Sequence, residues 1–167
     1  MSETKPKIQK ITPFLWFDTN AEEAVNFYVS IFPNSRVTKM TRFGDTGPGP
    51  KGSVFTVAFE LDGQEFAGLN GGPMYKFTEA VSFVINCDDQ AEIDRYWEKL
   101  SEGGEPGRCG WLKDKFGLSW QVVPRILPEL LQGHDAESSA RAVQAMMKMN
   151  KLDIAVLQGA ANGAVPA

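Results

Sequence analysis

One stretch of the chain occurs twice, and this internal repeat limits the possible folds more than any local pattern does. The first copy, residues 10–18, reads KITPFLWFD, and the second, residues 80–88, reads AVSFVINCD. Each copy ends in an aspartate, and an Ala-Glu pair and a later aromatic residue follow at the same spacing. An internal repeat is stronger evidence about a fold than local propensity. We therefore predict a duplicated unit made of a strand, a helix and further strands.

Composition excludes several classes of partner. The 167 residues carry a formal net charge of −4, which argues against binding to nucleic acid or to an anionic membrane surface. No apolar run approaches the ~20 residues that a membrane span needs, and the polar N-terminal residues do not resemble a secretory signal. The two cysteines, Cys87 and Cys109, are too few for a disulfide framework. We expect a bacterial, cytoplasmic protein with reduced thiols.

The first predicted module covers residues 8–72. Its helix follows Asp18, with Asn20 and Glu23 spaced as in a capping box. Strands are expected over 36–43, 53–61 and 64–70, and Asp62-Gly63 is a strong signal for a two-residue hairpin. The glycine- and proline-rich residues 44–52 form either a solvated hairpin loop or a mobile lid. In the second case Arg42 and Lys51 would supply positive charge for an anionic ligand.

The second predicted module covers residues 79–125, and a helical tail follows over 126–160. The module has a helix over 88–100 and strands over 109–112 and 118–123, where Pro124 ends the last strand. The tail has one helix over 136–150 and a shorter one over 152–157, and residues 161–167 are expected to fray. The methionines of the tail are typical of a soft packing surface. They either pack within the chain or form a subunit interface, and we predict a homodimer.

Four strings in the sequence resemble one known family. They are ITPFLWFD (11–18), AEEAVNFY (21–28), CGWLKDKFGLSWQVVP (109–124) and MNKLDI (149–154). Together they resemble the PhnB-like family of the glyoxalase/bleomycin-resistance (vicinal oxygen chelate) superfamily, over about residues 8–158. Members often carry the label 3-demethylubiquinone-9 3-methyltransferase. The resemblance implies an α+β fold in a single glyoxalase-like domain, residues 1–160. Its two tandem βαβββ modules form an open, barrel-like cleft, commonly in a dimer.

The resemblance also implies four positions for metal ligands, two in each module. Superfamily members usually hold a divalent ion there with His, Gln or Glu. The matching positions here are Ile11, Val81, Ala67 and Gln121. Three of these four side chains have no donor atom, and a metal ion needs about four to six ligands. The lone histidine, His134, lies beyond the two modules. We therefore expect no bound metal and no cofactor.

Residues two apart on a strand share a face, which predicts the lining of the cleft. The expected lining residues are Ile11, Pro13, Leu15, Ala67, Leu69, Val81, Phe83, Ser119 and Gln121. Phe14, Trp16 and Trp120 then point away from the cleft, although a pleat shift of one residue exchanges the two sets. Trp16, Arg42, Asn70 and Trp120 are additional candidates. The cleft is apolar with one or two polar groups, or it is filled by core side chains.

The predicted function is binding of a small, largely apolar molecule in this cleft. One alternative is a metal-independent enzyme, whose titratable groups would be Glu65, Asp114, Cys87 or Cys109. A structural or regulatory dimer is another alternative. Methyl transfer is less favoured, because the segment after the first strand lacks the glycine-rich turn that such enzymes usually carry. The sequence identifies no catalytic residue.

Overall fold

The structure, a computed structural model, describes residues 9–163. The chain divides into two compact units, residues 1–76 and 77–167, and each unit contains one copy of the repeat. The predicted α+β class with two βαβββ modules is confirmed. Residue 8, where the first module was predicted to begin, and residues 164–167 of the predicted frayed terminus lie outside the described residues. No helix within residues 9–163 is both long and apolar enough to cross a membrane.

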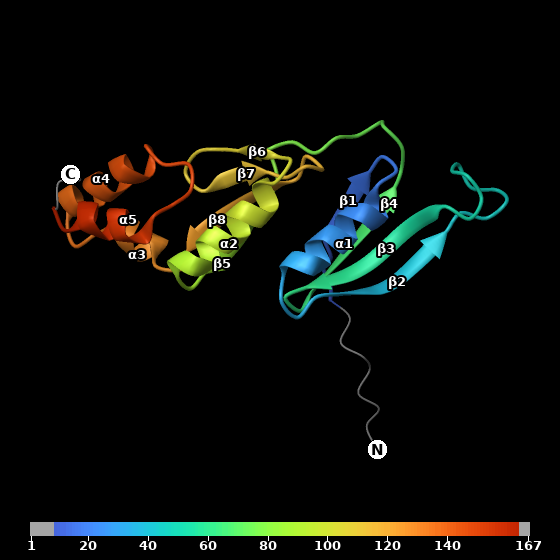
Figure 1. Ribbon diagram of the computed structural model, residues 1–167, viewed down its shortest axis with the longest axis horizontal. Helices are drawn as coiled ribbons and strands as arrows, with labels where there is room; N and C mark the ends of the chain where they lie inside the picture. The colour runs from blue at the N-terminus through green and yellow to red at the C-terminus, as the bar shows by residue number, and fades with distance from the viewer. Residues whose placement is uncertain (1–8, 164–167) are drawn as a thin grey trace, which may run out of the picture. The chain divides into compact units, whose positions relative to one another are not determined.

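The first unit is a four-stranded sheet with one helix across a face (Figure 1). Its elements in chain order are β1 (Phe14–Phe17), α1 (Ala21–Ile31), β2 (Arg36–Arg42), β3 (Val54–Leu61) and β4 (Gln64–Asn70). The strand order is β1-β4-β3-β2, and only the β1–β4 pair is parallel. Asp62 and Gly63 both have positive φ, 47° and 77°, as a type I′ turn between β3 and β4 requires.

The second unit repeats this topology and adds three helices. Its sheet has the order β5-β8-β7-β6, and β5 is parallel to β8. The elements are β5 (Ser82–Cys87), α2 (Gln90–Ser101), β6 (Glu105–Pro106), β7 (Trp111–Lys113), β8 (Ser119–Pro124), α3 (Leu127–Gln132), α4 (Ala136–Met146) and α5 (Ile154–Ala161). Helix α3 and the short strand β6 were missed by the sequence analysis.

Strand pairing confirms the spacing of the repeat. Ala67 pairs with Phe14 in the first sheet, and Gln121 pairs with Val84 in the second. Both Ala67 and Gln121 lie four residues after a turn glycine, and Phe14 and Val84 are 70 positions apart. The two copies therefore share strand register as well as strand order.

Each sheet buries the face that its helix covers. In the first unit the buried sheet residues include Leu15, Phe17, Val57 and Phe59, and α1 contributes Ala24, Val25 and Tyr28. In the second unit they include Cys87, Trp120 and Val122, and α2 contributes Ile93, Tyr96 and Leu100. Burial of one large apolar side chain contributes about 1.5–3 kcal/mol. These helix-covered faces are the main source of stability in each unit.

The two helices begin with different caps, and the predicted capping box at Asn20 is wrong. The Asn20 side chain makes no capping hydrogen bond. Instead Asn70, at the end of β4, accepts a hydrogen bond from the Ala21 N–H at 2.8 Å and donates to the Val54 carbonyl at 3.0 Å. The reciprocal box lies in the second copy. There Asp89 accepts from the Glu92 N–H, and Glu92 accepts from the Asp88 N–H, both at 2.8 Å.

The helical tail packs against its own unit. The N–H groups of Cys109 and Gly110 donate to the carbonyls of Met149 and Asn150, both at 2.8 Å. Leu152 and Leu157 are fully buried. Of the two interpretations of the tail, packing within the chain is therefore observed for residues 149–157. Helix α4 ends at Met146 rather than at the predicted residue 150.

The loop between β2 and β3 continues the hairpin beyond its strands. The Phe43 N–H donates to the Ser53 carbonyl at 2.9 Å, and the Gly52 N–H donates to the Phe43 carbonyl at 2.9 Å. Arg42 donates to the Gly52 carbonyl at 3.0 Å, and Lys51 pairs with Asp45 at 2.6 Å. Both cations that were considered for an anionic ligand are thus engaged within the loop.

Candidate functional site

Each sheet has a second face that no helix of its own unit covers, and we call it the open face. Directly opposed residues on paired strands share a face, so the register assigns the residues. The open face of the first sheet carries Phe14, Trp16, Thr56, Ala58, Ala67 and Leu69. The open face of the second carries Ser82, Val84, Trp111, Lys113, Ser119 and Gln121.

The structure does not bring the predicted lining residues of the first and last strands of a module onto one face of the sheet. Ala67 and Leu69 lie opposite Phe14 and Trp16, not beside Leu15, which is buried on the helix-covered face. Phe83 shows the same error in the second copy, because it pairs with the buried Trp120. Phe14 and Trp16, from the alternative set shifted by one residue, share a face with Ala67 and Leu69. The register between two paired strands decides which of their residues share a face. The sequence of a parallel pair does not show that register.

Four residues of the first unit form an apolar surface that we call the aromatic shelf: Phe14, Trp16, Leu69 and Tyr75. Phe14 is 58% exposed and Tyr75 is 60% exposed. The Trp16 indole is fixed, because its Nε1–H donates to the Gly72 carbonyl at 2.9 Å. The Tyr75 ring meets it edge-on, with 4.9 Å between centroids. A Cβ at Gly71 would lie 2.2 Å from the Trp16 ring, so glycine is needed for this packing.

The open face of the second sheet is more polar. Gln121 donates through Nε2 to the Ser82 hydroxyl at 2.9 Å. Beside this pair Ser119 is only 1% exposed, and its hydroxyl has no hydrogen-bond partner among the described residues. Buried polar groups normally have a partner, and leaving one unpaired costs about 1–3 kcal/mol. The Ser119 hydroxyl is therefore an unusual feature of this face.

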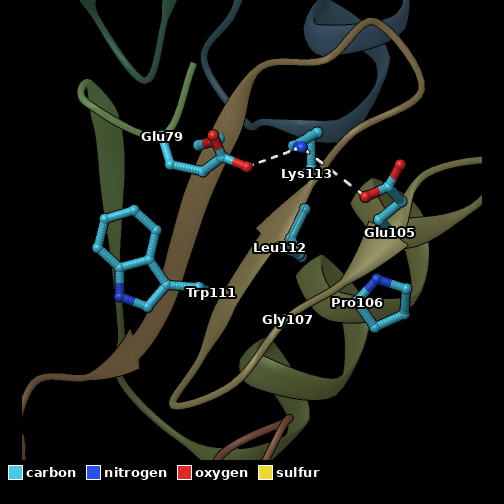
Figure 2. Close-up of a pocket in the computed structure, with 8 residues that line it drawn as sticks. Glu79, Glu105, Pro106, Gly107, Trp111, Leu112 and Lys113 are labelled. Carbon is cyan, nitrogen blue, oxygen red and sulfur yellow. Dashed lines mark ion pairs between the residues drawn. The ribbon is translucent and has the colours of Figure 1, made fainter. Parts of the chain in front are cut away.

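A small pocket of about 130 Å³ lies over β6, β7 and β8 (Figure 2). Ser119, Trp111 and Lys113 line it, together with Glu79, Glu105 and Pro106. Figure 2 shows Lys113 between two carboxylates: its Nζ is 2.8 Å from Glu79 and 3.7 Å from Glu105. The hydrogen bond with Glu79 raises the pKa of Lys113, and the same bond lowers the pKa of Glu79. Lys113 and Glu79 are therefore both charged near neutral pH.

Asp114 organises the hairpin that carries half of this pocket. Its Oδ1 accepts from the N–H groups of Phe116 and Leu118 at 2.8 and 3.1 Å, and its Oδ2 accepts from the Trp120 indole at 2.9 Å. Asp114 is 3% exposed. These contacts explain why Asp, Gly and Trp are spaced as they are in KDKFGLSW, and they give Asp114 a structural role. Trp120, a candidate site residue, donates one of these hydrogen bonds to Asp114.

The remaining candidates are dispersed. Ile11 and Val81 precede their strands and are exposed, and the Pro13 carbonyl accepts from the Ala67 N–H at 2.9 Å. Asn70 is used as the cap of α1, and Arg42, at the end of β2, donates to the Gly52 carbonyl of the loop described above. The structure thus brings Ala67 and Leu69 together on one open face, and Ser119 and Gln121 on the other.

The titratable candidates for an enzyme also occupy structural positions. Cys87 is fully buried, and burial raises the pKa of its thiol to about 12, so the thiolate is scarce at neutral pH. The Cys109 thiol lies 3.7 Å from the Met147 sulfur. Glu65 is exposed, and its backbone N–H and carbonyl bond to the Gln9 side chain at 3.2 and 2.9 Å.

The residues at the implied metal positions do not fit a metal ion. Ile11, Val81 and Ala67 offer no donor atom, and the single amide oxygen of Gln121 cannot hold an ion that needs about four to six ligands. Within residues 9–163, no three His, Cys, Asp or Glu side chains are grouped so that they could hold a metal ion.

Sequence reasoning missed Lys113, Trp111 and Glu79. The signal for the first two was present, because Trp111 and Lys113 are two apart on a strand and face Gln121 and Ser119 across the Phe116-Gly117 turn. Counting outward from that turn would have found both. Glu79 lies in the segment before β5 and carries no comparable signal.

Comparisons with known proteins agree with this architecture. The sequence model of the family described as 3-demethylubiquinone-9 3-methyltransferase matches residues 9–123. A Bacillus cereus PhnB protein, named as a candidate 3-demethylubiquinone-9 3-methyltransferase, is 39% identical, with a TM-score of 0.64 over 70% of this chain and 99% of that one. The Pseudomonas aeruginosa protein PA1353 is 24% identical, with a TM-score of 0.59 over 70% and 98%.

A more distant structure has the same fold. The fosfomycin resistance protein FosX from Listeria monocytogenes, solved with Mn(II) and sulfate, is 14% identical, with a TM-score of 0.50 over 75% of this chain and 98% of that one. No curated protein matches the sequence.

Proposed function

Because the chain belongs to the PhnB-like family of the glyoxalase (vicinal oxygen chelate) superfamily, we propose that it binds a small, largely apolar organic molecule. The molecule lies on the open face of the first sheet. Binding needs no divalent metal, and the protein acts as a homodimer.

The aromatic shelf is the observation that carries this proposal. Its rings present exposed apolar surface at fixed positions, since Trp16 is held by the Gly72 carbonyl and by Tyr75. Rigid aromatic groups lose little conformational entropy when a ligand covers them. A flat or aliphatic molecule that stacks on Phe14 and Trp16 removes that surface from water, which is favourable by about 25 cal/mol per Å².

The metal-free part of the proposal rests on the chemistry of this chain. FosX was solved with Mn(II), whereas three of the four corresponding positions here have no donor atom. A ligand must then be held by apolar contact and hydrogen bonds rather than by coordination.

Catalysis is the weaker candidate, because an enzyme needs a titratable group at its site. Asp114 is fully used by the β7–β8 hairpin, and the thiol of Cys87 stays protonated. Methyl transfer is weaker still, since Asp18-Thr19-Asn20 after β1 contains no glycine.

Native mass spectrometry of freshly purified protein tests the binding proposal through a co-purifying small molecule. Phe14→Ser should reduce its occupancy at least about tenfold through lost apolar contact. The matched control is Val81→Ser, an apolar residue before β5 that is 63% exposed, against 58% for Phe14, and it should retain the molecule. Absence of any bound molecule in wild type, or equal loss in both variants, contradicts the proposal.

The dimer is supported by apolar residues that the tail leaves exposed in α4, just after it and in α5, namely Val143, Met147 and Val156. Light scattering at micromolar concentration should give twice the 18.4 kDa mass of the chain. A monomeric mass would remove the dimer from the proposal and leave ligand binding to be judged by mass spectrometry alone.

A further inference from the structure

We propose that the pocket over β7 and β8 binds the neutral carbonyl group of a small ring compound. This inference rests on the proposed function only in taking the ligand to be a small organic molecule, and it adds a second site in the chain. The site itself is distinct from the aromatic shelf, because all of its residues lie in the second unit.

Two hydrogen-bond donors meet at the pocket. Ser119 and Lys113 are directly opposed across the β7–β8 pair, so their side chains leave the same face close together. The Ser119 hydroxyl has no partner within the described part of the chain. Lys113 has three N–H donors, and two of them face Glu79 and Glu105. One carbonyl oxygen can accept from the Ser119 hydroxyl and from the third proton of Lys113.

The charges around these donors select against anions. One lysine and two glutamates leave the pocket with a net charge of −1. A carboxylate or phosphate would be repelled by Glu79 and Glu105, since like charges in a partly desolvated site are unfavourable. A neutral acceptor meets no such repulsion. The pocket thus offers its donors to the carbonyl oxygen of a ketone, lactam or amide and disfavours the charge of an acid.

Size and lining indicate a single ring. The volume is about 130 Å³, and an engineered cavity of about 150 Å³ admits benzene. Trp111 gives the pocket a flat apolar wall beside the group formed by Lys113 and the two glutamates (Figure 2). A six-membered ring with one carbonyl satisfies both this wall and the donors.

The fold alone does not account for the Ser119 hydroxyl. Alanine at this position would pack in the same space and would avoid a buried unpaired group, which costs free energy. Ser119 and a second donor line the same pocket. An unpartnered hydroxyl is expected at such a place if a ligand supplies the acceptor.

Cyclohexanone is the probe for this site, with cyclohexanecarboxylate as the anionic counterpart. Binding is followed by the indole N–H resonance of Trp111, assigned by its loss in Trp111→Phe, during titration of the full-length protein. We expect cyclohexanone to shift this resonance with a dissociation constant in about the millimolar range, as suits so small a ligand. The carboxylate should bind at least about tenfold more weakly, because of the net negative charge.

Variants separate the hydrogen bond from mere occupancy. Ser119→Ala should weaken cyclohexanone about three- to tenfold, the loss expected for one hydrogen bond, and Lys113→Met should also weaken it. Ser101→Ala is the control, because its hydroxyl bonds the Trp97 carbonyl on α2 at 2.5 Å and lies outside the pocket. That variant should bind like wild type.

Four outcomes overturn the inference: no shift of Trp111, equal binding of ketone and carboxylate, unchanged binding in Ser119→Ala, or equal loss in Ser101→Ala. Failure of the proposed function is recognised separately. If the co-purified molecule depends on Phe14 but cyclohexanone does not bind as described, only the carbonyl pocket is wrong. If no molecule co-purifies but cyclohexanone binds as described, the carbonyl pocket is supported and ligand binding at the aromatic shelf is contradicted.

Discussion

The two open faces occupy the same place on the same scaffold and differ in chemistry. At matching positions of the repeat, Ala67 stands where the second sheet has Gln121, and Trp16 stands where it has Asn86. The first face is aromatic and exposed. The second contains the Gln121–Ser82 hydrogen bond, the unpaired Ser119 hydroxyl and the charged group around Lys113.

The helix-covered faces did not diverge in this way. Leu15 and Phe17 correspond to Ile85 and Cys87, and all four turn toward the helix of their unit. A core face must stay apolar to keep its burial energy, whereas an open face is free of that requirement. The difference between the two copies is therefore concentrated where a ligand can reach.

The largest expected difference in stability between the two sheets comes from the position three residues before the turn glycine. This residue is Asp114 in the second sheet and Glu60 in the first. Asp114→Ala removes three hydrogen bonds to a buried carboxylate and should destabilise the second unit by about 3–5 kcal/mol. Glu60 makes only a surface ion pair with Arg36, and Glu60→Ala should leave unfolding nearly unchanged. Urea unfolding with hydrogen exchange resolved by unit measures both.

Comparable destabilisation by the two substitutions would show that the hairpins are held in the same way. Asp114→Asn provides a milder second variant, because the amide oxygen can still accept from the Phe116 and Leu118 N–H groups. Its cost should be smaller than that of Asp114→Ala.

A smaller effect distinguishes Cys87 from its counterpart Phe17, which does not titrate. The folded state keeps the Cys87 thiol protonated up to a pKa of about 12, against an ordinary value of 9.0. The unfolded chain loses that proton first, so stability falls as pH rises through this window, by about 1.4 kcal/mol per pH unit. Between pH 8 and 10, wild type should therefore lose about 1.4 kcal/mol more than Cys87→Ala. Equal losses by urea unfolding would mean that the thiol is not buried.

The smallest effect has the opposite sign. Ser119→Ala in ligand-free protein should raise stability by about 1 kcal/mol, because it removes a buried unpaired hydroxyl. Glu65 occupies the matching position after the turn of the first sheet and is exposed, so Glu65→Ala should change little. A loss of stability in Ser119→Ala, by urea midpoint at neutral pH, would indicate that the hydroxyl is already bonded.

Much of this molecule was determined by the sequence itself. The repeat of KITPFLWFD predicted two copies of one supersecondary unit, and Asp62-Gly63 predicted the turn between β3 and β4. Both follow from local rules, since a recurring pattern repeats its own structure and a two-residue turn needs positive φ at both positions.

Tertiary structure decided the parts that depend on contact across the sequence. The cap of α1 comes from Asn70, 49 positions away from Ala21, although Asn20 is adjacent. The side of the sheet that Leu15 and Phe83 face was set by parallel pairing with β4 and β8. Glu79 joins Lys113 across 34 residues. A side-chain period of two gives each strand two faces but does not say which one the neighbouring strand matches. The sequence therefore determined the elements and their repetition, and the register between distant strands determined which side chains share an open face.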